Sequence, residues 1–84
     1  MIRGRVQGVG FRYFVARRAL ALALAGWVRN RPDGAVEVEA EGPRGALERL
    51  VEAAGEGPAG ARVTELKQGW SERPPVHQGF RITD

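Results

Sequence analysis

Apolar and polar positions recur along this chain with two different periods, which predict strands and helices in a regular order. Residues 1–6 are apolar at both ends and indicate a strand, and residues 7–10 form a loop with two glycines. Apolar side chains then recur at helical spacing from Phe11, which predicts a helix ending near Leu22. Residues 19–25 alternate alanine with leucine, a period of two that is also typical of strands. Both residues are strong helix formers, however, so the helix is the better interpretation.

The middle of the chain predicts a hairpin. Gly26 precedes a strand over residues 27–31, and the Pro-Asp-Gly sequence of residues 32–34 is typical of a turn. Residues 35–41 alternate valine or alanine with glutamate. This alternation predicts a half-buried strand with an acidic outer face.

The remaining segments predict a second helix and two more strands. Residues 44–54 carry leucine and valine on one face of a helix, whereas residues 61–70 and 79–84 read as strands. The order is β-α-β-β-α-β followed by a short terminal strand. It predicts an α+β, ferredoxin-like sandwich in which an antiparallel sheet carries both helices on one face. We expect residues 1–84 to form a single domain, in a fold that hosts many functions.

Composition excludes several classes of chemistry. The chain has no cysteine, which rules out disulfides, thiolate nucleophiles and cysteine-bound metals and fits a cytoplasmic protein. The longest apolar stretch, from Ala19 to Val28, is ten residues long. A membrane-spanning helix needs roughly 20 residues, so we expect no membrane association.

Charge is distributed unevenly along the chain. Residues 1–32 contain seven arginines and no acidic residue, although the net charge of the whole chain is only +3. A segment whose charged side chains are all positive indicates an anionic ligand. Solvated arginines on a basic surface are the alternative, and the composition does not decide between them.

The residues available for catalysis are few. Ser71 is the only serine and His77 the only histidine, and both lie in a polar, proline-containing segment that does not resemble a catalytic triad. Three glutamates project along one strand face without partner ligands: Glu37, Glu39 and Glu41. This set does not make a zinc site. The residues alone leave a magnesium site open, but no pattern supports one, and we expect no metal and no cofactor.

The glycine loop before the first helix is the strongest candidate site. Gly8 and Gly10 allow backbone N–H groups to converge, and the start of a helix attracts phosphate. Arg12 would lie in the first turn, where a cation opposes the helix dipole, and no acid occurs between Phe11 and Leu24. A bound anion would remove this conflict. An arginine that turns towards solvent or an acidic strand is the alternative.

Asn30 is the second candidate. Asparagine is depleted in strands, yet here it ends one just before a turn. A functional amide is one interpretation. Turn capping is the other and, from the residues alone, the better one.

Two blocks of sequence resemble one known family. The run Gly4–Arg12 is similar to the acylphosphatase signature G-x-V-Q-G-V-x-F-R, and Gly26–Asn30 is similar to its second block, G-W-V-x-N. The spacing between the blocks also agrees. Further matches follow downstream at Asp33-Gly34, Val36, Val38, Glu41-Gly42-Pro43 and Gly79–Ile82. The resemblance therefore covers essentially the whole chain.

This resemblance implies the fold predicted above and a metal-independent hydrolase. Its substrate would be an acyl phosphate and its products a carboxylate and inorganic phosphate. Arg12 would hold the phosphate oxygens with its forked guanidinium, and Asn30 would orient the attacking water. Backbone N–H groups would cradle the phosphoryl group along the loop formed by Gln7, Gly8, Val9, Gly10, Phe11 and Arg12. We expect such an enzyme to act as a monomer without nucleic acid.

The chain also departs from the family pattern. Its first strand is shorter than that of most members. Ala23 occupies a site where the family often has a glycine that ends the first helix. If this residue is left-handed, alanine costs roughly 1 kcal/mol there.

Two other functions stay open at this point. One is a domain of a larger carbamoyltransferase of hydrogenase maturation, because such enzymes begin with an acylphosphatase-like domain. The other is a basic nucleic-acid-binding domain, which would need aromatic side chains on adjacent central strands for base stacking. We predict that Trp27 and Trp70 instead pack in or near the core.

Overall fold

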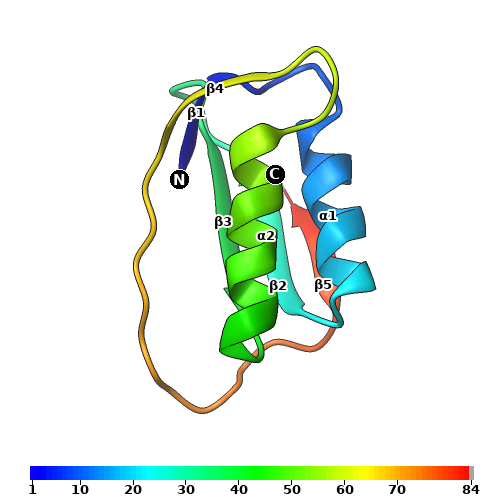
Figure 1. Cartoon of the computed structure of the whole chain (residues 1–84), viewed down its shortest axis with the longest axis vertical. Coiled ribbons are helices and arrows are strands. Elements are labelled where there is room, and N and C mark those ends of the chain that lie inside the picture. Colours follow the sequence, from blue (N-terminus) through cyan, green and yellow to red (C-terminus); the bar gives the residue numbers. More distant parts are fainter. Residues whose placement is uncertain (84) are drawn as a thin grey trace.

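The computed structural model describes residues 1–83 and confirms the predicted order of elements (Figure 1). Within these residues the bounds are β1 Ile2–Arg5, α1 Phe11–Ala21, β2 Ala25–Asn30, β3 Val36–Glu41, α2 Arg44–Glu56, β4 Arg62–Leu66 and β5 Phe80–Thr83. The strand expected over residues 61–70 therefore ends early, at Leu66. The final residue of the predicted strand 79–84, Asp84, lies outside the described residues.

The five strands form one sheet in the order β4-β1-β3-β2-β5. Both helices cover the same face of the sheet, as predicted (Figure 1). The expectation of a wholly antiparallel sheet is wrong in one pair, because β5 runs parallel to β2. The long connection after β4 carries the chain to the end of the sheet where β2 begins, so β5 starts there too (Figure 1).

The core lies between the helices and the covered face of the sheet. Its largest fully buried side chains are those of Val6, Phe11, Val15, Val28 and Val36. They come from both sides of the loop at residues 7–10 and from the two strands that form the hairpin. The core thus fixes the elements that carry the candidate site. No helix in residues 1–83 is long and apolar enough to cross a membrane.

The prediction that Trp27 and Trp70 pack in or near the core is wrong, because neither belongs to the core cluster or to the side chains packed against it. Trp27 is half-buried beside Val28, which takes the core position, and the Arg29 guanidinium lies 4.9 Å from its ring centroid. Trp70 lies beyond the end of β4 and is 40% exposed, with the Arg44 guanidinium 4.4 Å from its ring. Both rings therefore act as apolar platforms for arginines rather than as core residues.

Two strand glycines allow neighbouring strands to approach closely. A Cβ atom at Gly26 would lie 1.9 Å from the carbonyl oxygen of Glu39, and one at Gly4 would lie 2.1 Å from that of Arg62. Both glycines also have positive φ angles, +143° and +126°. A glycine inside a strand pattern often marks such an approach or a bulge, and the register of β1 against β4 does shift at Gly4.

Helix α1 ends in a left-handed residue that is not glycine. Ala23 has a φ angle of 56°, and the N–H groups of Ala23 and Leu24 donate to the carbonyls of Leu20 and Ala19. These two bonds form a Schellman motif, in which glycine is the favoured left-handed residue.

We expect the substitution Ala23→Gly to raise the free energy of unfolding by about 0.5–1 kcal/mol, because glycine adopts this conformation without strain. Urea denaturation would measure the change. The matched control is Ala21→Gly in the last turn of the same helix. The free energy of unfolding of this control is expected to fall by up to ~1 kcal/mol, because glycine is a poor helix former. A loss in both variants would contradict the prediction.

Candidate active site

The loop between β1 and α1 is held by the core at both ends. Val6 and Phe11 are each 1% exposed, whereas Gly8 and Gly10 between them are exposed. Both glycines are left-handed, with φ angles of 75° and 76°, and Gly10 precedes the helix without a side-chain cap. A Cβ atom on either glycine would meet nothing within 4 Å, so the need for glycine here is conformational. Such a loop at a helix start presents backbone N–H groups to an anion.

Arg12 is the second residue of α1, as the sequence predicted, and it is half-buried. The first turn of α1 contains no acidic side chain. The arginine therefore adds a fixed positive charge to the positive end of the helix dipole. The positive end of the helix dipole and the charge of Arg12 thus both favour an anion at this end of α1.

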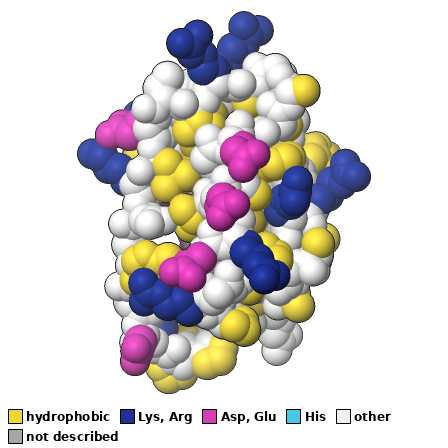
Figure 2. Space-filling model, viewed as in Figure 1, with side chains coloured by type: hydrophobic (Ala, Val, Ile, Leu, Met, Phe, Trp, Pro, Cys, Tyr) yellow, Lys and Arg dark blue, Asp and Glu magenta, His cyan; other side chains and the backbone are white. Residues whose placement is uncertain are grey.

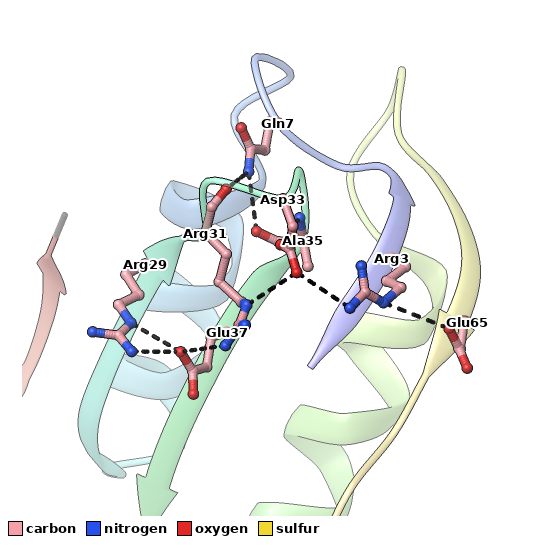
Figure 3. Close-up of polar contacts among 8 residues, drawn as sticks. All are labelled: Arg3, Gln7, Arg29, Arg31, Asp33, Ala35, Glu37 and Glu65. Atoms are coloured by element: carbon pink, nitrogen blue, oxygen red, sulfur yellow. Dashed lines mark hydrogen bonds and ion pairs between the residues drawn. The ribbon is translucent and has the colours of Figure 1, made fainter.

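Gln7 joins this loop to the hairpin between β2 and β3. Its side-chain Nε2 donates to the carbonyl oxygens of Arg31 at 2.8 Å and Ala35 at 3.0 Å (Figure 3). The sequence pointed to Gln7 only as one member of the phosphate loop and gave no sign of this connection. The acceptors are main-chain carbonyls, which leave no signature in a sequence.

Asn30 is the last residue of β2 and pairs with Val36 across the hairpin. Since strand side chains alternate, it shares the helix-covered face with Val28. Its Oδ1 atom is buried and accepts no hydrogen bond from residues 1–83. A buried acceptor without a donor is rare in native proteins and calls for a reason.

Asn30 is not the residue that caps the turn, which overturns the capping interpretation. Asp33 does so, because its Oδ1 accepts the N–H of Ala35 at 3.1 Å. That bond is the main cause of the lowered pKa of Asp33. Partial desolvation raises the pKa, and the nearby guanidinium groups of Arg31 and Arg3 add smaller lowering effects. The turn is therefore complete without the amide of Asn30, whose acceptor remains available.

The open face of the sheet pairs several of its arginines with carboxylates (Figure 3). Arg29 and Arg31 contact Glu37 at 2.7 and 3.5 Å, and Arg3 contacts Asp33 at 3.3 Å. On the opposite face, cations lie among the carboxylates along α2, and further cations lie on the side of α1 (Figure 2). Three of the seven arginines of residues 1–32 are thus paired with carboxylates on the open face.

A large groove lies away from the candidate site residues. The groove, about 800 Å³ in volume, is bordered by α2, β3 and the connection after β4, and its lining includes neither residues 7–12 nor Asn30. In residues 1–83 no three histidine or carboxylate side chains converge as metal ligands would. The candidate site is therefore identified by its polar groups rather than by cavity size.

The sequence model of the acylphosphatase family matches residues 1–82. The chain belongs to the acylphosphatase family. An acylphosphatase from Salinibacter ruber is 56% identical over 81 residues, which are 96% of this chain and 85% of that protein. The crystal structure of acylphosphatase from Bacillus subtilis superposes with a TM-score of 0.94 at 49% identity, covering 98% of this chain and 91% of that one.

The acylphosphatase fold of this chain is also found inside a much larger protein. The crystal structure of HypF from T. kodakarensis matches with a TM-score of 0.84 and 30% identity. The match covers 98% of this chain but only 11% of HypF. Relatives of similar length are more alike in sequence, so the comparison with HypF carries less weight for this chain.

Proposed function

We propose that this chain hydrolyses acyl phosphates to a carboxylate and inorganic phosphate without a metal ion. The observation that carries the proposal is the buried, unpaired Oδ1 of Asn30. Gln7, at the start of the glycine loop, donates hydrogen bonds to the carbonyls of Arg31 and Ala35 in the turn that follows Asn30. The names of the family's members as acylphosphatases support the same substrate class.

The phosphoryl group binds at the start of α1 in this proposal. Backbone N–H groups of residues 7–12 and the guanidinium of Arg12 donate to its non-bridging oxygens. Phosphoryl transfer requires mainly positioning and stabilisation of charge, which these donors supply. Binding an anion here also offsets the unfavourable electrostatic interaction between the charge of Arg12 and the positive end of the helix dipole.

Asn30 then orients the nucleophile. Its Oδ1 accepts a hydrogen bond from a water molecule, which turns a lone pair of the water towards phosphorus. The water oxygen forms a bond to phosphorus as the bond between phosphorus and the acyl oxygen breaks. The carboxylate leaves without protonation because it is a weak base. The water proton passes to a phosphate oxygen, so no protein base is needed.

The test is hydrolysis of benzoyl phosphate in the presence of EDTA. We expect turnover by the wild-type chain and a fall in kcat of about 10²–10³ in Asn30→Ala, the range typical for one lost polar group in a preorganised site. KM and inhibition by phosphate should change little, because Asn30 contacts the water rather than the phosphate. A folded wild-type chain without turnover would refute the proposed function. Equal kcat in the two proteins would remove Asn30 from the mechanism.

We also infer that the enzyme acts as a monomer, because every proposed site residue comes from one chain. Sedimentation at several concentrations would test this inference. Nucleic acid is not among the proposed partners, since three arginines of the open face are paired with carboxylates.

A further inference from the structure

We propose that Gln7 is a positioning residue that fixes the phosphate loop relative to Asn30; this inference rests on the proposed function. Gln7 is the only polar side chain in the loop of residues 7–10. Both hydrogens of its amide are engaged, one on each side of the hairpin turn (Figure 3). The side chain therefore acts as a bridge between the two halves of the site.

The two acceptors lie directly beside the catalytic strand end. Arg31 follows Asn30 in the chain, and Ala35 precedes Val36, the cross-strand partner of Asn30. The Arg31 carbonyl also accepts the N–H of Gly34 at 3.1 Å, and the Ala35 carbonyl accepts the N–H of Arg31 at 2.8 Å. Each oxygen thus receives one bond that closes the turn and one from Gln7. If the Gln7 side chain were removed, the turn would keep its own backbone hydrogen bonds but lose the two hydrogen bonds that connect it to the loop.

In this arrangement Gln7 sets the placement of the loop relative to the hairpin, but neither segment needs Gln7 in order to fold. Val6 and Phe11 bury the two ends of the loop independently of Gln7, and Asp33 caps the hairpin independently of it. Without the bridge, each half of the site keeps its local structure, and only their relative placement changes. A misplacement of about 1 Å between reacting groups can reduce a rate by about 10².

The substitution Gln7→Ala tests the bridge. We expect kcat for benzoyl phosphate to fall by roughly 30- to 100-fold, whereas KM and the inhibition constant of inorganic phosphate change less than about threefold. The matched control is Gln78→Ala, which truncates an exposed glutamine outside the site and should leave both constants unchanged.

A second variant, Gln7→Glu, gives a readout that a purely structural role would not produce. An ionised carboxylate cannot donate to the two carbonyl oxygens, but a protonated carboxyl can donate to one. We expect kcat of this variant, relative to wild type, to rise as the pH is lowered from 7 to 5. Arg31 and Asp33 are the charged residues of the hairpin turn beside the bridge, and they form an ion pair at 3.4 Å. The bond from the N–H of Ala35 lowers the pKa of Asp33, so this carboxylate stays ionised between pH 7 and 5.

The possible outcomes separate the two proposals. A wild-type chain without turnover overturns the proposed function together with the bridge. An active wild-type chain whose Gln7 variants keep full kcat overturns the bridge alone. The bridge is also wrong if Gln7→Ala raises KM and leaves kcat unchanged, or if the Gln7→Glu profile parallels that of wild type. If Gln7→Ala does not fold, the pH profile of Gln7→Glu decides.

Discussion

The Arg12→Ala variant is expected to lose at least about 10³ in kcat/KM for benzoyl phosphate while remaining folded. The guanidinium would donate two parallel hydrogen bonds to the phosphate, and its charge acts where the helix dipole and the loop N–H groups already point. Steady-state hydrolysis and inhibition by phosphate would measure the loss. Inhibition should weaken as well, which distinguishes Arg12 from Asn30.

Two further variants make this result interpretable. Arg12→Lys keeps the charge but not the fork, so its activity should lie between those of wild type and Arg12→Ala. Arg17→Ala removes an exposed arginine from the same helix and should leave kcat/KM nearly unchanged. A similar loss from Arg17→Ala would mean that general positive charge, rather than a specific contact, attracts the substrate.

Replacing Gly26 by alanine is expected to reduce the free energy of unfolding by about 3 kcal/mol. The new Cβ would lie 1.9 Å from the Glu39 carbonyl oxygen, and the φ angle of +143° is itself strained for alanine. The clash is with backbone, so β2 and β3 must separate to relieve it. Urea denaturation would measure the effect.

The control for Gly26→Ala is Gly45→Ala in α2. A Cβ at Gly45 meets nothing within 4 Å, and its φ angle is not positive. Alanine should stabilise the helix at this position by up to ~1 kcal/mol. Opposite signs for the two substitutions are expected, and a neutral Gly26→Ala would mean that the two strands approach less closely than the structure indicates.

The periodicity of the sequence predicted the order of the elements because the spacing of apolar residues in each segment distinguishes a helix from a strand. It overextended the strand at residues 61–70, since Trp70 continued the apolar pattern although it lies on Arg44 outside the sheet. The parallel pairing of β5 was not predictable in this way. Its direction depends on where the preceding connection takes the chain, and no local pattern records that path.

The sequence predicted only part of the candidate site, namely the residues that depart from a local pattern. Arg12 stood out because a cation in the first helical turn breaks a local rule, and Asn30 stood out because an amide ended a strand. Gln7 broke no rule. Its partners are carbonyl groups that the fold brings to it from more than twenty residues away. Only the structure shows that connection.

The unpaired Oδ1 of Asn30 also affects how this protein would respond to selection. A buried acceptor without a donor lowers stability, and an apolar side chain of similar shape would remove that cost. A library screened only for resistance to heat or protease would therefore tend to replace Asn30. Laboratory evolution of this domain needs a screen for turnover beside the one for folding, because at this position the two criteria favour different residues.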